Sequence, residues 1–590
     1  MSVLEPLSPW VRPHLKCDGR RSASTEQAQA LHILNTLPLV RWLVLATLLV
    51  NAIGLVTPII NAGDSVTYAA LAQHMVRHGD WVNLVLDGQD WLDKPHFPFW
   101  VTALFFKLGG VNAISYNLPG FLFHLIGAYY TYRVARLFYG RDAAWLAVLV
   151  FVSAFQVMLT STDVRAEAYL TGSIMGACYY WLRHDAQPRL KYLLLGALFS
   201  ATAVMTKGIF TLITISSGLV ALWLYQGRWR ELWRGRWWLA LAVTLLFTTP
   251  ELLALYLQFD AQPDKLVFGR TGVSGIRFFV WDSQFGRFFN TGPIRNTDGN
   301  PAFFLHVFLW AFLPWVAVAV AALGQAWRGW RRNDGRGRGQ LVVLGASFAV
   351  TFGLFSLTSF QLDYYTVIVF PFAAILCGQY LATVLAQPDG RRGLALAQLG
   401  TAVLMAGLAL ALALYVGQPV VTGMVVLVLL LVGLTLGQLW PTPWRARALL
   451  VLPVCGVALL YSFITVLMTL TYLSLGLAYN ANRLLATQSP AAIYVWQMDL
   501  VARELGLYNP APTFSVSEPA RLPAAGQPYY LVIRAAQLAQ LDPLPGQVEP
   551  VAQGRWVVDK TGLLPRMLQL ARGTEPPEDI RIVRIDPGLR

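Results

Sequence analysis

Long runs of apolar residues alternate with short polar stretches along most of the chain. Each run holds about 20 residues, the length that an α-helix needs to cross the hydrocarbon core of a bilayer. The pattern predicts an all-α, polytopic membrane bundle with about thirteen spanning helices. The first of these runs are 38–60, 116–138, 143–161, 166–184, 190–206, 209–226 and 237–258.

The apolar segment 95–113 interrupts this pattern, because it is short, contains two prolines and carries Lys107. If it crossed the membrane, the basic cluster at 133–141 would face outside, against the positive-inside rule. A helix that lies along the interface, with its aromatic and basic residues, restores the alternation. We therefore predict interfacial helices in an outer loop, 61–115, and a cytoplasmic N-terminal tail, 1–37.

The amino-acid composition is that of a membrane protein, and the distribution of basic residues explains the positive net charge. Of 590 residues, 56% are hydrophobic and 13% are charged, whereas about a quarter are charged in soluble domains. A net charge of +14 is also typical of nucleic-acid binding. Here the basic residues form short clusters between apolar runs, as membrane topology requires. We therefore expect the chain to lie in the bilayer and not to bind nucleic acid.

From residue 480 onward the apolar runs end. AAIYVWQMD and PYYLVIRA are typical of buried strands, VARELGLY of a short amphipathic helix, and RWVVD of a further strand. We predict a transmembrane domain at 38–479 and a small α/β domain at 480–590 on the outer face. The same alternation brings five polar stretches to that face: 61–94, the turn around Asp163, the turn at Lys207, the loop 259–300 and the turn at Asp363.

A carboxylate and a lysine share the first outer loop. Asp64 begins the stretch DSVTYAALAQHMVRHGDW, and Lys94 lies in WLDKPHFPFW. Together at the membrane face they indicate a site for an anionic, lipid-borne substrate, since lysine binds phosphate well. Asp64 could instead be the N-cap of a helix at 65–78.

A secondary transporter or lipid flippase is the alternative function. Such proteins usually hold ionisable residues near the bilayer midplane and contain internal repeats. Here the apolar runs contain few charges, and the acidic residues gather in the outer loops. The pattern favours an enzyme.

The order of several motifs resembles a known family. After Asp64 and Tyr68 come GDW (79–81) and Lys94-Pro95, and later MTKG (205–208), WDSQFGRF (281–288), FLPW (312–315) and FSLTSFQLDYYTVIVFP (355–371). In this order the chain resembles the bacterial GT-C membrane glycosyltransferases related to the aminoarabinose (lipid A) transferase and to protein O-mannosyltransferases. The resemblance covers the first 375 residues.

The chain departs from the family pattern in three places. Asp64-Ser65 stands where the family often has Asp-Glu followed by Arg, and Lys94-Pro95-His96 replaces Lys-Pro-Pro. Gln361 and Asp363 stand in place of a late lysine. The fold carries over through these changes, but the aminoarabinose–lipid A reaction is not carried over with it.

The resemblance implies an enzyme of the bacterial inner membrane that moves a sugar from a polyprenyl phosphate to a lipid, glycan or protein, with inversion. A base must then deprotonate the acceptor, and a carboxylate can supply one. Asp64 is the candidate, with Asp163 as a second acidic residue near the acceptor. Asp163 could instead be solvated or paired with Arg165.

The phosphate of the leaving group needs cations, and Lys94, Lys207 and Arg287 are the candidates. Lys207 could also be a lysine that snorkels to the headgroups, and a loop arginine such as Arg287 is more often structural. No cofactor is expected; a divalent metal lacks support, because the histidines of the first loop have no ligand spacing. The remaining site candidates are Tyr68, Glu167, His96, Asp363 and Tyr364.

Overall fold

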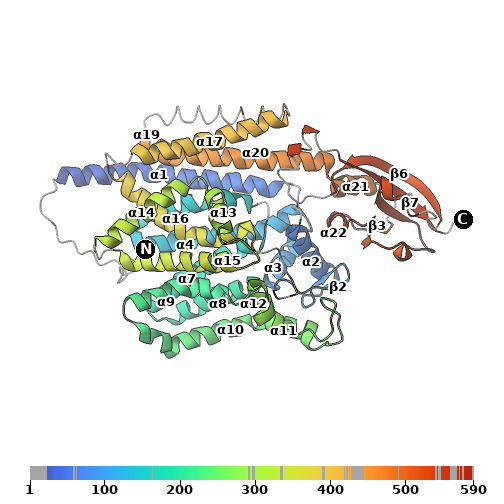
Figure 1. Ribbon diagram of the computed structural model, residues 1–590, viewed down its shortest axis with the longest axis horizontal. Helices are drawn as coiled ribbons and strands as arrows, with labels where there is room; N and C mark the ends of the chain where they lie inside the picture. The colour runs from blue at the N-terminus through green and yellow to red at the C-terminus, as the bar shows by residue number, and fades with distance from the viewer. Residues whose placement is uncertain are drawn as a thin grey trace.

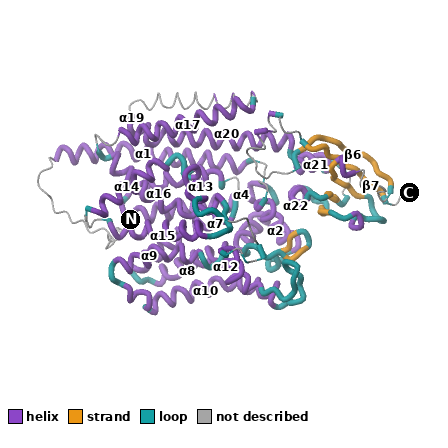
Figure 2. The backbone as a smooth tube through the Cα atoms, viewed as in Figure 1, coloured by secondary structure: helices purple, strands orange, loops and turns teal. Residues whose placement is uncertain are grey.

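The computed structural model shows a bundle of long, roughly parallel helices with a small sheet domain at one end (Figures 1 and 2). Side chains are described from residue 37 on. The structure describes residues 23–587 except 58–59, 61–62, 162–163, 290, 292, 295–298, 333–336, 388–391, 418, 420–422, 424–425, 427–443, 489–490, 539–540, 542–545, 559–567, 570–571 and 574–576.

Within the described residues, seven helical segments are long and apolar enough to cross a membrane. A pair of helices bent by 113°, α13 (Phe303–Ala311) and α14 (Val316–Arg331), would make an eighth. The chain is a multi-pass helical membrane protein, as predicted, whereas the number of about thirteen spans stays a prediction. The seven segments lie on α1 (Ala23–Ile53), α8 (Leu190–Lys207), α10 (Gly235–Leu255), α15 (Arg338–Leu357), η5 with α16 (Asp363–Val369 and Phe370–Leu385), α17 (Arg392–Val416) and α20 (Leu452–Leu475).

Some predicted spans form central helices that fail this test of length and hydropathy. Helix α4 (Ala113–Tyr139) buries Asn117, His124 and Thr131. A helix packed between other helices can carry such polar groups without exposing them to lipid. The predicted run 143–161 is broken, because α5 ends at Val152 and a short α6 begins at Phe155. The other helices of this group are α5 (Arg141–Val152), α6 (Phe155–Leu159), α7 (Ala166–Ala186) and α9 (Thr211–Tyr225).

Close packing of small residues holds the centre of the bundle together. Helix α16 packs on α5, and α7 packs on both α4 and α8. A Cβ at Gly378 of α16 would lie 2.5 Å from the carbonyl oxygen of Ala143 and from the backbone nitrogen of Ala147. Only glycine therefore permits this approach of the two backbones.

The end of the bundle that carries the predicted site is built from short elements. They include α2 (Asp64–His78), α3 (Phe97–Gly109) and a hairpin of β1 (Val85–Leu86) and β2 (Gln89–Asp90). With 13 residues, α3 is about 20 Å long, shorter than a hydrocarbon core of about 30 Å. This length agrees with an interfacial helix, which stays a prediction. Two further short helices at this end are α11 (Gly275–Arg277) and α12 (Ser283–Phe288), whereas η2 (Trp229–Trp233) and α19 (Trp444–Ala446) are short elements toward the opposite end.

The predicted C-terminal α/β domain is present, and its strands lie at the right-hand end of Figure 1, with α22 between them and α2. Its sheet has the order β4-β3-β5-β7-β6, with β3 parallel to β4 and β5 and with β7 antiparallel to β5 and β6. Strand β5 is buried along almost its whole length, as expected for a strand with neighbours on both sides. The elements are α21 (Leu477–Leu485), β3 (Ile493–Trp496), α22 (Asp499–Tyr508), β4 (Thr513–Val516), β5 (Tyr529–Arg534), α23 (Ala535–Leu538), β6 (Gln547–Trp556) and β7 (Glu578–Asp586).

Helix α22 fastens this domain to α2. The side-chain amide of Gln73 donates to the carbonyl oxygens of Gly506 at 3.0 Å and of Leu507 at 3.3 Å. Leu507 also joins the buried hydrophobic cluster of α2 and α3. The domain therefore packs against α2, the helix that begins at Asp64.

Candidate functional site

Asp64 is the first residue of α2, and its carboxylate is held by two donors. Gly63, with φ of 76°, occupies the N-cap position, so Asp64 is not the capping residue. The Oδ2 atom accepts a hydrogen bond from the Tyr364 hydroxyl at 3.1 Å and lies 3.5 Å from Nη1 of Arg165. The side chain of Asp64 is 43% exposed. It is therefore an oriented carboxylate that other molecules can still reach.

The turn before α7 brings Arg165 to this carboxylate. The carbonyl oxygen of Val164 accepts hydrogen bonds from the hydroxyls of Ser65, at 3.2 Å, and Tyr116, at 2.9 Å. The guanidinium of Arg165 lies 4.2 Å from the centre of the Tyr364 ring, a cation–π contact. Asp163 lies outside the described residues, and its role stays a prediction.

A buried ion pair lies at the ends of two neighbouring helices. Glu167, in the first turn of α7, pairs with Lys207, the last residue of α8. The ammonium of Lys207 lies 3.4 Å from the centre of the Tyr365 ring. Because Lys207 is 8% exposed, the alternative that it snorkels to the headgroups is wrong. Among the described residues, Oε2 of Glu167 has no hydrogen-bond partner.

One cavity of about 460 Å³ brings Lys94 and Lys207 together. The ammonium of Lys94 pairs with Oδ2 of Asp93 at 2.7 Å. Most of the remaining wall is apolar and aromatic, from Phe210, Phe278, Phe279, Phe285, Phe288, Phe289, Phe355 and Phe360. The cavity therefore presents two lysines, together with the carboxylates of Asp93 and Glu251, in a wall that is otherwise largely apolar.

His96 lies behind the wall of this cavity, where it contacts the lining residue Glu251. Its backbone N–H donates to Oε2 of Glu251 at 2.9 Å, and its ring lies 3.0 Å from Oε1. Nε2 lies 2.9 Å from the carbonyl oxygen of Val82, which can only accept. Burial lowers the pKa of His96, but the charge and hydrogen bond of Glu251 outweigh it and raise the pKa above its usual value. His96 is completely buried and does not line the cavity, and its hydrogen bonds hold the segment that follows Lys94.

Two tyrosines and an aspartate complete the surroundings of Asp64. Tyr68 is buried and packs edge-on against Phe99, with ring centres 5.1 Å apart. Burial, and then the charge of Asp64, raise the pKa of Tyr68 well above its usual value, so it remains a neutral phenol. Asp363 accepts a hydrogen bond from the backbone N–H of Tyr364 at 2.8 Å, which orients the residue that holds Asp64.

The chain is similar to known proteins in both its sequence and its fold. The family of dolichyl-phosphate-mannose-protein mannosyltransferases matches residues 93–253. An undecaprenyl phosphate-alpha-4-amino-4-deoxy-L-arabinose arabinosyl transferase of Shewanella sediminis is 27% identical over 265 residues, which is 44% of this chain and 45% of that protein. The transferase of the same description from Pseudomonas paraeruginosa is 28% identical over 377 residues, 61% of this chain and 64% of that protein. Each match spans less than two thirds of the relative's own length.

The fold extends the likeness over nearly the whole molecule. The crystal structure of ArnT from Cupriavidus metallidurans bound to undecaprenyl phosphate superposes with a TM-score of 0.69 at 20% identity, over 92% of this chain and 98% of that chain. The chain is similar to the ArnT-like GT-C transferases, in sequence over part of its length and in fold over nearly all of it. The resemblance drawn from the order of motifs is thereby confirmed.

This chain brings together most of the residues singled out from its sequence. Arg287 lies in α12, but its side chain is outside the described part. Among the described residues, no cluster of three or more His, Cys, Asp or Glu side chains could hold a metal ion. The cluster around Asp64 joins Tyr68, Arg165 and Tyr364, and the cavity joins Lys94 and Lys207.

Sequence reasoning missed Glu251 and Tyr365, both of which line the cavity. Glu251 lies within the apolar run 237–258. A carboxylate inside a membrane helix is a functional candidate by default, because burying an unpaired charge there is costly. Tyr365 directly follows Tyr364 in a motif already singled out, yet nothing in the sequence indicates that its ring lies against Lys207.

Proposed function

We propose that this chain is a membrane glycosyltransferase that uses a polyprenyl-phosphate-linked sugar as donor. The sugar passes to a lipid, glycan or protein acceptor on the outer face, with inversion at the anomeric carbon. Its ArnT-like fold supports this function, as do relatives described as undecaprenyl phosphate-aminodeoxyarabinose transferases. The solved ArnT structure, described as bound to undecaprenyl phosphate, supports the donor class.

The observation that carries the proposal is the carboxylate of Asp64 beside a cavity with two lysines. Asp64 takes the proton from the acceptor nucleophile as the bond to the sugar forms. The Tyr364 hydroxyl and Arg165 hold the carboxylate in position. A positioned general base contributes about 10²–10⁴-fold to the rate. Asp163 is proposed as the second acidic residue near the acceptor.

Lys94 and Lys207 bind the phosphate that leaves with the lipid. Each lysine is paired with a carboxylate in the structure, Asp93 and Glu167 respectively. A phosphate between them adds charge-assisted contacts that strengthen as negative charge grows on the leaving oxygen. The aromatic wall of the cavity suits the isoprenoid chain. Residues of the chain itself account for these steps, and we propose no metal or other cofactor.

The membrane topology follows from the charges at the two ends of the bundle. The end opposite Asp64 carries a concentration of arginines, among them Arg228, Arg234 and Arg236 after α9 and Arg328 and Arg331 at the end of α14. The positive-inside rule assigns that end to the cytoplasm. We therefore propose a protein of the bacterial inner membrane with Asp64 and the domain 480–590 outside.

The decisive experiment is Asp64→Asn, which keeps the shape of the side chain but removes the base. In a strain that lacks the gene, wild-type protein should restore a sugar-modified lipid, glycan or protein that mass spectrometry detects. Asp64→Asn should lower turnover about 10²–10⁴-fold while the purified protein still binds polyprenyl phosphate. Asp87→Asn is the matched control, since Asp87 lies in the same loop and pairs with Arg503 of the C-terminal domain. Turnover by Asp64→Asn close to wild type would exclude the proposed base.

A further inference from the structure

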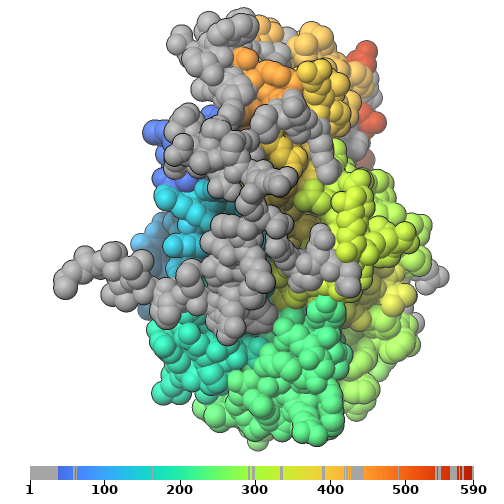
Figure 3. Space-filling view, turned by 90° about the vertical axis from the view of Figure 1, so that its left-hand side faces the viewer, coloured from blue at the N-terminus to red at the C-terminus, as the bar shows by residue number. Residues whose placement is uncertain are grey.

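A second, larger cavity opens at the end of the bundle opposite Asp64. It encloses about 1020 Å³ between the last turn of α4, the end of α14, the start of α15 and the end of α16. Figure 3 looks at this end of the molecule, where the yellow-green residues of α14 and α15 reach the surface. The proposed reaction does not use this cavity.

The lining of this cavity is basic. Arg328, Arg332 and Arg338 line it together with glutamines, and no acidic residue belongs to its described lining. Nη2 of Arg338 donates to the carbonyl oxygen of Trp330 at 2.8 Å. Among the described residues, the buried Nε of Arg338 and the buried hydroxyl of Tyr139 have no hydrogen-bond partner. Buried polar groups of this kind normally have a partner, and an anion with several acceptor oxygens would supply it.

An apolar groove continues directly from the basic cavity. It encloses about 570 Å³, and all of its lining side chains are apolar. The two spaces share Ala326, Trp330, Leu341 and Leu376. On the groove side, Leu323 and Trp327 of α14 are 60% and 59% exposed, as expected for a face turned to lipid. The basic cavity and the apolar groove are thus adjacent and share part of their lining.

We propose that the two compartments bind one anionic glycerophospholipid from the leaflet opposite the Asp64 site. The phosphate headgroup lies among Arg328, Arg332 and Arg338, and an acyl chain lies along the groove between α14, α15 and α16. Basic pockets between membrane helices recognise anionic headgroups in this way. The apolar groove commits the occupant to a lipid, because a free phosphate would leave it unfilled.

Native mass spectrometry of the purified, full-length protein tests this site. Phosphatidylglycerol should remain bound at lipid concentrations at which zwitterionic phosphatidylethanolamine does not. Arg328→Gln combined with Arg338→Gln should weaken phosphatidylglycerol binding about tenfold or more, since each basic residue near the headgroups contributes about 1 kcal/mol. Arg331→Gln is the control for the change at Arg328, because it removes one charge from the same helix, α14, but does not line the cavity.

A second variant tests the groove without changing any charge. Gly345 lies in the groove lining, and a Cβ there would meet nothing within 4 Å, so Gly345→Trp is chosen to place a ring in the groove. It should displace phosphatidylglycerol, while sugar transfer, which uses the opposite end, continues. Equal loss of lipid from Arg331→Gln, equal binding of both phospholipids, or tight binding of inorganic phosphate that Gly345→Trp leaves unchanged would each overturn the proposal. None of these outcomes bears on the role of Asp64.

Discussion

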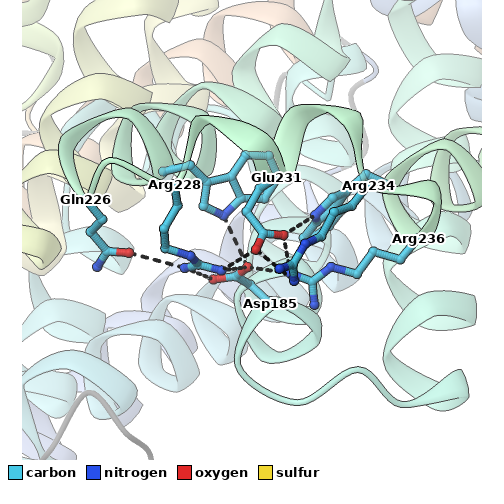
Figure 4. Close-up of polar contacts among 8 residues, drawn as sticks. Asp185, Gln226, Arg228, Glu231, Arg234 and Arg236 are labelled. Atoms are coloured by element: carbon cyan, nitrogen blue, oxygen red, sulfur yellow. Dashed lines mark hydrogen bonds and ion pairs between the residues drawn. The ribbon is translucent and has the colours of Figure 1, made fainter.

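Carboxylates and cations cluster at both ends of the bundle, but the two clusters differ in how completely they are paired. At the end opposite the site, Asp185 and Glu231 are buried among Arg228, Arg234 and Arg236 (Figure 4). Oδ1 of Asp185 accepts from Trp223 at 3.1 Å, from Arg228 at 2.9 Å and from Arg236 at 3.2 Å. Every carboxylate oxygen of this cluster has at least one donor.

The cluster around the Asp64 site is paired less completely. Glu167 keeps one oxygen without a partner among the described residues, Asp64 is 43% exposed, and two lysines line an open cavity. The same residue types therefore serve two purposes. A network in which every carboxylate oxygen has a donor joins helices. A carboxylate oxygen without a donor, next to two lysines at a cavity, leaves polar groups that a ligand can contact.

The largest effect on stability should follow from breaking the cluster of Asp185 and Glu231, whose carboxylate oxygens all have donors. Asp185→Asn removes the charge that Arg228 and Arg236 share, and loss of one partner from a buried ion pair costs about 3–5 kcal/mol. We expect the lower end of this range, because both arginines reach solvent. The melting temperature in detergent should fall clearly, while polyprenyl phosphate binds the folded protein as before. Asp142→Asn, also near this end of the bundle, is the control and should change little.

The next largest effect should appear at the Asp64 site, as weaker binding of polyprenyl phosphate. Lys94→Ala should weaken binding of polyprenyl phosphate about ten- to a hundredfold, because a charge-assisted contact contributes about 1.5–3 kcal/mol. Lys94→Arg should restore only part of the binding, since the planar guanidinium of arginine does not replace the compact ammonium of lysine. Lys107→Ala is the control, as Lys107 is exposed on the neighbouring α3 and does not line the cavity. Unchanged donor binding by Lys94→Ala would exclude it as a phosphate ligand.

Lys207 needs a compensated variant, because Lys207→Ala alone strands the buried charge of Glu167. Glu167→Gln combined with Lys207→Met removes both charges together, and replacing a buried pair in this way is often neutral for stability. We expect a melting temperature near that of the wild type with donor binding still about tenfold weaker or more. Recovery of binding in the double variant would show that Lys207 serves only Glu167.

The sequence predicted the parts of this comparison that depend on local pattern. The structure contains the apolar helices, Asp64 after the first of them, and the strands after residue 480. Each of these features depends on residues that are neighbours in the sequence. The pairing depends on which helices pack together. Glu167 and Lys207 are 40 residues apart, and Asp64 and Tyr364 are 300 apart, so no spacing indicates either contact. For the same reason, the sequence could not show that His96 is buried against Glu251.

The two ends should also respond oppositely to pH. Burial raises the pKa of Glu231, but hydrogen bonds and charge from Arg236 and Arg228 outweigh it, so its pKa lies below the usual value. Its contribution to stability is therefore present above the pKa of the unfolded chain and is lost as the pH falls through the folded pKa. The raised pKa of His96 has the opposite consequence, since its contribution is lost as the pH rises from the usual value of 6.5 through the folded one.

Melting temperature measured against pH separates these two contributions. Glu231→Gln should flatten the acid side of the curve and leave the alkaline side as in the wild type. His96→Gln should flatten the alkaline side, at the site end, and leave the acid side. If either variant changed both sides equally, the two ends would not be independent.

The smallest effect should come from the exposed pair that links the site loop to the C-terminal domain. Arg503 lies 2.6 Å from Oδ2 of Asp87, with 19% and 37% of their side chains exposed. Pairs near solvent contribute about 0.2–1 kcal/mol, so Arg503→Gln should hardly change the melting temperature or turnover. Gln73→Ala should cost more, because its amide bonds the carbonyl oxygens of Gly506 and Leu507 at the buried contact with α22. Hydrogen exchange of α22 measures this contact directly, and faster exchange in Arg503→Gln than in Gln73→Ala would show that the exposed pair, and not the buried contact, holds the domain above Asp64.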